Sequence, residues 1–364
     1  MKQRLSTRLQ SGPERSKAWR RIRAAMFHAC CMALALGIGQ RAASAQGTHS
    51  FGLSLPPFWN LFGSWDPDFP SAGVLPSRFV WTELFPGKPA RDQGSCGSCW
   101  AHATVGAVEY QVRLYERREV DLSEQWLIDC TGGGNGCNGG FQMYNLFLHG
   151  SSTDIYGNNG AVLENDFPTT GSNETCRGPY SHHYWLQGWS YIGIPPQLQG
   201  SRDQLKRAVY LFGPISTSVY AGNWPSGAFT GVLNDCRPDF VNHMVLIVGW
   251  SDALHAWRIR NSWGSGWGEN GEAWITYECS SIGFGANYVR YPTGRGVYVD
   301  FSYTGFAGAE TGLFNQPFNT LNEGVNALDP GGTLSIKTGS SSARLTLTKP
   351  MTVTTFGGPV TIGQ

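Results

Sequence analysis

One short segment, residues 93–100 (QGSCGSCW), contains the residue best placed to act as a nucleophile. The residues after it recur at the spacing of one helix face: Ala101, Val105, Val108 and Val112. Cys99 therefore lies at or near the N-terminus of a helix, where unpaired N–H groups and the helix dipole favour a thiolate over a thiol. Because only the thiolate is a competent nucleophile, the sequence predicts covalent catalysis by Cys99.

The same octet resembles the signature of the papain and cathepsin family of cysteine proteases. This resemblance implies that Cys99 attacks a peptide carbonyl and that Gln93 helps to hold the oxyanion. It also implies protein or peptide substrates and a reaction that needs no cofactor and no metal.

A thiol protease needs a base and a group that orients the base. His243, in VNHMVLIVGW, opens an apolar strand and lies within the roughly 130 to 150 residues after the cysteine that are typical of the family. Asn261 falls slightly beyond that range, but its motif NSWGSGWGENG resembles the family strongly, and it would orient the imidazole by accepting the second ring N–H. Trp263 would cover that hydrogen bond, and Trp267 would line the leaving-group side.

Substrate binding is expected along the glycine-rich loop GGGNGCNGG and the residues after it. In the family, the equivalents of Gly139 and Gly140 pair with substrate main chain, as in the addition of a β-strand. The resemblance places Phe141, Gln142 and Met244 in the main side-chain pocket. Met244 would make this pocket shallow and apolar, which predicts a preference for medium aliphatic residues.

Several histidines allow other interpretations. His102 lies three residues after Cys99 on the predicted helix, where it is either a catalytic group or a helix-surface residue that tunes the thiol. The pair His182-His183 resembles the two histidines of the occluding loop in cathepsin B, which would indicate an exopeptidase. The segment around the pair is too short for such a loop, and this favours an endopeptidase.

The cysteine count is consistent with an exported protein. Of nine cysteines, two precede residue 46, and the remaining seven suit three disulfides and one reactive thiol. The resemblance to papain implies two pairs, Cys96 with Cys137 and Cys130 with Cys176, and leaves Cys236 with Cys279 as the third. A redox role for the Cys96-Cys99 pair and zinc binding are the less favoured alternatives.

Residues 1–45 have the three parts of an export signal: arginines, an apolar run over 24–39, and Ala43-Ser44-Ala45 as a cleavage site. We therefore expect a secreted or periplasmic protein that is free of the membrane after cleavage. A retained anchor is the alternative, although the run is shorter than the about 20 residues of a typical span. Residues 46–73 are expected to form a short pro-segment that lays Phe58, Trp59 or Phe62 into the cleft, or else a surface arm.

The segments that must position these residues predict an α+β fold. A helix over about 99–117, a second after Ser123 and a third over 201–212 precede strands at 215–220, 244–250, 256–260 and 271–278. The resemblance implies the two-lobed papain architecture over residues 74–291, with a helical left lobe and an antiparallel β right lobe. The active cleft would lie between the lobes.

From residue 297 to 364 the composition changes to short alternating pieces such as TLSIK, RLTLT and MTVTTF. Thr320 and Glu323 form a possible capping box before them. This small β-rich segment resembles the opening of a right-handed parallel β-helix of the pectate-lyase type. It would be a truncated module that contacts a surface or a carbohydrate, or else it would pack on the protease domain or on another chain.

A net charge of +1 over 364 residues gives no electrostatic reason to expect nucleic-acid binding. The sequence thus predicts a secreted cysteine endopeptidase. Two other functions remain open: a non-catalytic peptide-binding or adhesion protein, and an enzyme that acts on carbohydrate through the C-terminal segment.

Overall fold

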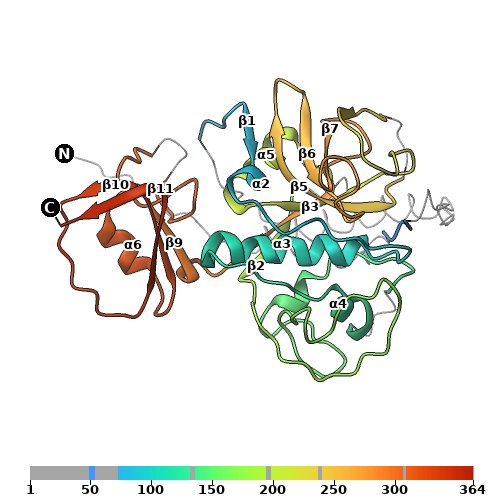
Figure 1. Ribbon diagram of the computed structural model, residues 1–364, viewed down its shortest axis with the longest axis horizontal. Coiled ribbons are helices and arrows are strands. Elements are labelled where there is room, and N and C mark those ends of the chain that lie inside the picture. The colour runs from blue at the N-terminus through green and yellow to red at the C-terminus, as the bar shows by residue number, and fades with distance from the viewer. Residues whose placement is uncertain are drawn as a thin grey trace, which may run out of the picture. The chain divides into compact units, whose positions relative to one another are not determined.

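The computed structural model describes residues 49–53, 73–131, 136–193, 198–236, 240–305 and 309–363 (Figure 1). The chain divides into two units, Met1–Ala42 and Ala43–Gln364, and the first lies outside the described residues. The predicted signal peptide therefore lies almost wholly in that first unit. In the described part of the chain, no helix is long and apolar enough to cross a membrane.

Helix α3 (Cys99–Glu116) begins at the predicted nucleophile. Most of its side chains are buried, because the helix is covered on more than one side. Figure 1 shows α3 running between the large sheet and the part of the chain that contains α4 (Glu124–Cys130). The helix ends before Arg117, whose positive φ of 56° takes the backbone out of the helical path.

Capping side chains fix where two other helices begin. Ser123 accepts a hydrogen bond of 2.9 Å from the Trp126 amide, which confirms the predicted N-cap of α4. Ser201 caps α5 (Arg202–Phe212) and forms a capping box with Gln204. The third helix therefore starts one residue later than predicted, because Ser201 is its cap.

Among the described residues, eight strands form the large sheet, in the order β2-β8-β3-β5-β6-β7-β4 with β1 also paired to β5. All neighbours are antiparallel except β4 and β7. The strands are β1 (Arg78–Val80), β2 (Gly188–Tyr191), β3 (Ile215–Val219), β4 (Val232–Leu233), β5 (His243–Ser251), β6 (Ala256–Arg260), β7 (Glu272–Thr276) and β8 (Phe284–Arg290). Two short helices, α2 (Trp81–Leu84) and η2 (Tyr144–Phe147), complete this part.

Strand β5 is buried along its whole length and carries His243 as its first residue. It runs one residue further at each end than the predicted 244–250, because β3 pairs with it as far as His243 and β1 pairs with Ser251. The last predicted strand is shorter, as β7 begins only after Gly271, whose φ is 84°. A fully buried central strand gives His243 a rigid support.

The C-terminal strands form a separate three-stranded parallel sheet in the order β11-β10-β9. Its elements are η3 (Thr293–Arg295), β9 (Gly296–Val299), α6 (Leu321–Ala327), β10 (Thr333–Ser341) and β11 (Thr352–Ile362). A small apolar core, which includes Val299, Leu321 and Ile336, fills the space between α6 and this sheet. The predicted capping box is only half formed. Thr320 accepts from the Glu323 amide at 3.3 Å, but the Glu323 carboxylate accepts from the Thr320 hydroxyl instead of the Thr320 amide.

This segment packs on the end of α3. The Tyr298 hydroxyl donates to the Leu114 carbonyl, and Arg295 pairs with Glu116 at 2.9 Å. The Phe314 ring lies 5.5 Å from that of Trp81. The C-terminal segment is therefore joined to the rest by specific contacts.

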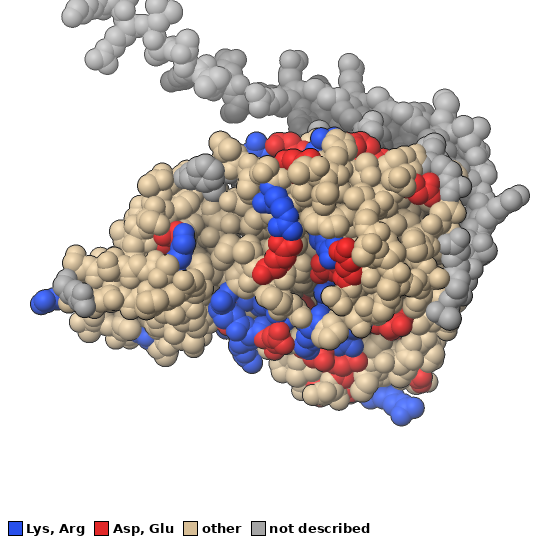
Figure 2. All heavy atoms as spheres, turned by 45° about the horizontal axis from the view of Figure 1, so that its top comes forward, with Lys and Arg blue, Asp and Glu red and all other residues tan. Residues whose placement is uncertain are grey.

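Charged side chains lie mostly in mixed groups on the face shown in Figure 2, where basic and acidic residues are adjacent. One exposed pair of a basic and an acidic residue is Arg78–Glu83, at 2.5 Å. Such exposed pairs each contribute about 0 to 1 kcal/mol to stability. Such pairs are therefore consistent with the net charge near zero, but they contribute little to the stability of the fold.

Candidate active site

The predicted nucleophile is the first residue of α3 and is fully buried. Ser98 precedes it as the N-cap residue, but its side chain makes no capping hydrogen bond. The first-turn amides of the helix are therefore left without that partner at the position where a thiolate would form. The disulfide Cys96–Cys137 and a 2.9 Å hydrogen bond from the Gly97 amide to the Cys137 carbonyl hold the approach to this turn.

His243 and Asn261 are brought together as predicted by the resemblance. His243 Nε2 lies 2.7 Å from Asn261 Oδ1, and the Ser262 amide donates to the same oxygen at 2.8 Å. Since the carboxamide oxygen only accepts, Nε2 must carry the proton. Nδ1 is then free to accept a proton. It has no hydrogen-bond partner among the described residues, and the Cys99 thiol is therefore not hydrogen-bonded to it.

The sulfur of Cys99 lies beside the beginning of β5. The backbone amide of Met244, the residue after His243, is close enough to lower the pKa of the thiol, as is the amide of Gly52. Burial outweighs both amides and raises that pKa to about 11. Burial also lowers the pKa of His243 to about 4. In this form the thiol and the imidazole are therefore both neutral.

Aromatic rings enclose the histidine. The Trp263 ring lies 4.9 Å from that of His243, and Trp267 lies 5.6 Å from Trp263. Trp224 adds a perpendicular ring at 6.1 Å from His243, which sequence reasoning did not identify. This apolar surround keeps water away from the hydrogen bond between His243 and Asn261.

Gln93 is buried, and its carboxamide is held from both ends. Ser262 Oγ donates to Oε1 at 2.6 Å, while Nε2 donates to the Ser50 carbonyl at 2.8 Å and to the Cys96 carbonyl at 2.9 Å. The donor expected to hold the oxyanion therefore binds a carbonyl oxygen of residues 49–53.

Residues 49–53, the N-terminal arm, lie along the site. The Gly140 amide donates to the Gly52 carbonyl at 2.8 Å, and the Leu53 amide donates to the Asn242 carbonyl at 3.2 Å. The arm therefore pairs with the loop expected to bind substrate main chain. Phe58, Trp59 and Phe62, which were expected in the cleft, lie outside the described residues.

Side chains of the arm also contact the site. His49 stacks on Trp263 at 5.3 Å, and the Phe51 ring lies 6.1 Å from that of His243. A side chain at Gly52 would not fit, because its Cβ would come within 1.7 Å of the Gly97 carbonyl oxygen. Sequence reasoning expected a pro-segment or a surface arm over residues 46–73, but it did not identify residues 49–53 as the part that contacts the site, because much of this contact is made by the backbone.

The predicted pocket residues are not all brought together. Phe141 and Gln142 line one cavity of about 90 Å³, and Gln142 Nε2 donates to the Tyr191 hydroxyl. Met244 lines a different cavity, of about 250 Å³, behind the nucleophile. Gly139 has a φ of 110°, which suits glycine, and Gly140 packs against Trp100 so closely that a Cβ would lie 2.6 Å from it. The preference for medium aliphatic residues stays a prediction.

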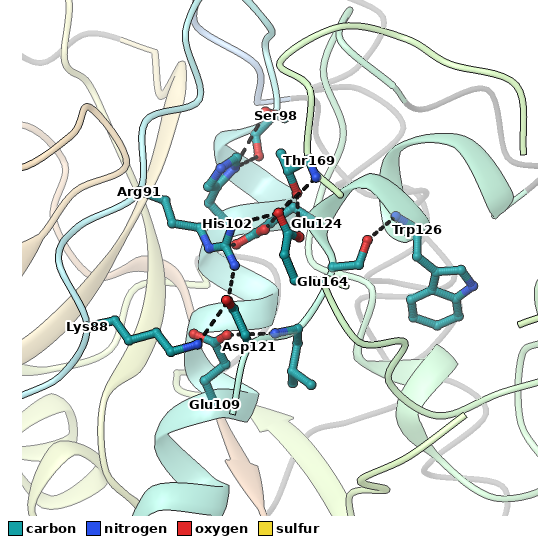
Figure 3. Close-up of polar contacts among 12 residues, drawn as sticks. Lys88, Arg91, Ser98, His102, Glu109, Asp121, Glu124, Trp126, Glu164 and Thr169 are labelled. Atoms are coloured by element: carbon teal, nitrogen blue, oxygen red, sulfur yellow. Dashed lines mark hydrogen bonds and ion pairs between the residues drawn. The ribbon is translucent and has the colours of Figure 1, made fainter. Parts of the chain in front are cut away.

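A partly buried ionic cluster lies beside α3, shown in Figure 3 around Arg91. Arg91 contacts Asp121, Glu124 at 3.4 Å and Glu164 at 3.0 Å. Burial raises the pKa of Glu124 and also that of Glu109, which is raised further by Glu124. Arg91 lies two residues before Gln93, so this ionic cluster anchors the segment that carries the residue expected to hold the oxyanion.

His102 is not a helix-surface residue, contrary to one expectation. It is 7% exposed, and Figure 3 shows its ring beside Ser98. Its Nδ1 lies 3.0 Å from the Ser98 carbonyl oxygen. Its Nε2 has no hydrogen-bond partner among the described residues, so no hydrogen bond joins it to the Cys99 thiol.

Three disulfides occur among the described residues: Cys96–Cys137, Cys130–Cys176 and Cys236–Cys279. These are the same pairs that were expected, and they leave Cys99 as the free thiol of the described residues. Asn173 uses its side-chain oxygen to accept from the Cys137 amide at 2.9 Å. This residue therefore has a structural role in the loop that carries Gly139 and Gly140.

A family model described as papain family cysteine protease matches residues 75–289. The viral cathepsin of Lymantria dispar multicapsid nuclear polyhedrosis virus is 35% identical over 198 residues, which cover 54% of this chain and 53% of that protein. The thiol protease aleurain of Arabidopsis thaliana is 36% identical, over 54% of this chain and 55% of aleurain. The chain thus spans about half the length of these curated relatives.

Solved structures give the same assignment of fold. A chain described with the mite allergens Blo t 1 and Der p 1 matches with a TM-score of 0.55 and 26% identity, over 66% of this chain and 80% of the other. Digestive procathepsin L 3 of Tenebrio molitor larval midgut matches with a TM-score of 0.53 and 30% identity, over 63% and 75% of the two chains. Both are consistent with mixed α and β content in two lobes.

Proposed function

This chain belongs to the papain family of cysteine proteases, and from that premise we propose that it is a secreted cysteine endopeptidase. The observation that carries the proposal is the hydrogen bond of 2.7 Å between His243 Nε2 and Asn261 Oδ1. It leaves Nδ1 free as a base while the Cys99 sulfur lies beside the next residue of β5.

The proposed reaction has two steps. In the first, His243 Nδ1 takes the thiol proton, the Cys99 sulfur bonds to the scissile carbonyl carbon, and the carbonyl oxygen becomes an oxyanion that Gln93 Nε2 stabilises. The C–N bond then breaks as the imidazolium gives its proton to the leaving amine. In the second step, His243 takes a proton from water, the hydroxide attacks the thioester, and the acid leaves as the thiol is restored.

The N-terminal arm serves as an inhibitory segment in this proposal. It binds the oxyanion donor through the Ser50 carbonyl and the substrate loop through Gly52. Its removal would admit water and substrate. Since burial is the first cause of both pKa shifts, removal should also allow the Cys99–His243 ion pair to form.

Endopeptidase action is proposed over exopeptidase action because the two adjacent histidines are held elsewhere. His182 Nδ1 lies 2.9 Å from the Gly160 carbonyl and Nε2 lies 3.4 Å from Asp154. His183 pairs through its backbone with Ala161. Both are thus held in the fold as structural residues.

The C-terminal parallel sheet keeps its expected role as a contact for a surface or a carbohydrate, in the manner of an incomplete pectate-lyase-type β-helix. The pairing of the strands supports a coil of this kind, since β10 pairs in parallel with both β9 and β11. The expectations that nucleic acid is not a partner and that the protein leaves the membrane after signal cleavage stay predictions.

Labelling with a thiol-directed epoxide inhibitor, followed by mapping of the modified residue, tests the proposed function. We expect the label on Cys99 once the arm is removed, and no proteolysis by Cys99→Ala. Proteolysis that survives Cys99→Ala would refute the mechanism. Peptide binding without any cleavage by the arm-free wild type would favour the alternative of a binding or adhesion protein.

A further inference from the structure

The cavity of about 250 Å³ lies between α3, strand β5, which carries His243, and the end of β6, which Asn261 follows. Three of its lining residues have a buried polar atom without a hydrogen-bond partner among the described residues: His102 Nε2, Tyr110 Oη and Asn261 Nδ2. Buried polar atoms nearly always have a partner. A cavity of this volume, lined by three residues that each have such an atom, is polar and roomy enough to hold ordered water.

The contacts of His102 decide which of its ring nitrogens accepts. Nδ1 lies 3.0 Å from the Ser98 carbonyl, and a carbonyl can only accept, so Nδ1 carries the proton. Burial lowers the pKa of His102 to about 4, so the ring is neutral near pH 7. Nε2 therefore presents a lone pair. The charged and titratable groups that act on this ring are Arg91, Asp92, Glu164 and His243, and none of them is hydrogen-bonded to Nε2.

Asn261 presents the complementary group. Its Oδ1 accepts from His243 and from the Ser262 amide, so the oxygen end of the carboxamide is held twice. The nitrogen end carries two N–H groups and has no partner among the described residues. A water molecule that accepts from Asn261 Nδ2 and donates to His102 Nε2 would satisfy one atom on each side of the cavity.

We propose that His102 is a positioning residue that acts on Asn261 through one water molecule bound in this cavity. The water holds the nitrogen end of the carboxamide, so that Oδ1 stays directed at His243 and stabilises the imidazolium. The inference rests on the proposed cysteine-peptidase function. It also links the helix of the nucleophile to the strand end that orients the base.

Two substitutions at one position test the proposal in the arm-free enzyme. His102→Phe removes the acceptor, whereas His102→Gln keeps one. We expect His102→Phe to lower kcat by about three- to tenfold, the size of one lost buried hydrogen bond, with little change in KM. The alkaline limb of the kcat/KM pH profile should move to lower pH, because the imidazolium loses support, and His102→Gln should restore most of both.

A matched control comes from the same cavity. Tyr110→Phe removes another unpartnered polar atom and should leave the pH profile unchanged. A His102→Phe profile that superimposes on the wild type would overturn the proposal, and so would a His102→Gln enzyme as impaired as His102→Phe. Epoxide labelling separates the two levels of argument: a protein that does not label at Cys99 contradicts the proposed function, whereas a labelled enzyme with an unmoved profile contradicts the role of His102 alone.

A crystal structure of the arm-free wild-type enzyme gives an independent check that needs no substitution. We expect a water within about 3.2 Å of both His102 Nε2 and Asn261 Nδ2. An ordered cavity without a water that reaches both atoms would refute the bridge.

Discussion

Each end of α3 is covered by another segment of the chain: the N-terminal arm at one end and the C-terminal segment at the other. The two segments fit closely in similar ways, but different interactions hold them in place. At the Cys99 end, a Cβ on Gly52 would lie 1.7 Å from the Gly97 carbonyl oxygen; at the other end, a Cβ on Gly296 would lie 1.8 Å from that of Tyr115. At each end, the residue of the covering segment that lies closest to the neighbouring backbone must therefore be glycine, because there is no room for a Cβ atom.

What holds each segment differs. The N-terminal arm is held largely by main-chain hydrogen bonds, to Gly140 and Asn242, which any extended peptide can make. The C-terminal segment is held by side chains, since Arg295 donates to the buried Glu116 at 3.0 Å and the Tyr298 hydroxyl donates to the Leu114 carbonyl. Contacts that a substrate can reproduce suit a removable cover, and side-chain contacts suit a permanent junction.

The largest effect is expected at Gln93, the side chain for which arm and substrate compete. Gln93→Ala should lower kcat of the arm-free enzyme by about 100- to 1,000-fold, since one oxyanion donor is lost. Steady-state kinetics on a peptide substrate measure this. Ser262→Ala is the matched control, because it removes only the hydroxyl that holds Oε1. An equal loss in both variants would show that Gln93 acts only through packing.

The next effect is expected at Gly52. Gly52→Val should displace the arm and raise the activity of the unprocessed chain by about tenfold or more, because the added atoms overlap the Gly97 carbonyl. Activity of the uncleaved protein, verified by mass, measures this change. Ser50→Ala keeps the carbonyl that Gln93 binds and should change little. An unprocessed Gly52→Val chain as inactive as the wild type would contradict the inhibitory role of the arm.

At the opposite end, Glu116→Gln should lower the free energy of unfolding by about 1 to 3 kcal/mol, because Arg295 loses its buried partner. Urea unfolding measures the loss, and kcat/KM should not change. Arg118 lies 3.7 Å from the same carboxylate but its side chain is 63% exposed, so Arg118→Ala should cost under about 1 kcal/mol. A change in kcat/KM with Glu116→Gln would mean that the two ends are coupled.

A smaller effect is expected in the ionic cluster near the middle of α3. Burial raises the pKa of Glu109 above its ordinary 4.5 in the folded protein, so the folded state binds this proton more tightly than the unfolded state. Its contribution to stability is fully present below pH 4.5 and is lost as the pH rises through the raised pKa. Glu109→Gln should therefore flatten the decline in stability between about pH 5 and 8, as read from thermal unfolding. A steeper decline would contradict this sign.

The sequence predicted those parts of the fold that have a local pattern. Helix α3, the cap at Ser123 and the paired Cys96 and Cys137 follow from apolar spacing, capping chemistry and the family motif. Helix and strand ends shifted by one to a few residues, since caps and pairing partners determine where each element ends. His243 beside Asn261 was predicted only through the family resemblance.

The rest depends on contacts that leave no local pattern. The arm binds largely through its backbone, so its sequence has no local pattern that predicts these contacts. Gln142 donates to Tyr191, which lies far along the chain, and Met244 faces a cavity away from Phe141. His102 could be recognised as close to Cys99, but its burial depends on how the strands cover α3. Long-range packing decided each of these positions.

The rate at which Cys99 is alkylated as a function of pH tests the central claim most directly. With the arm removed, we predict a component of the rate that persists well below the ordinary thiol pKa of about 8.5, because a thiolate pairs with the His243 imidazolium. The same component should be absent from the arm-covered chain and from His243→Ala. A single titration near the ordinary thiol pKa, identical in all three proteins, would contradict the account.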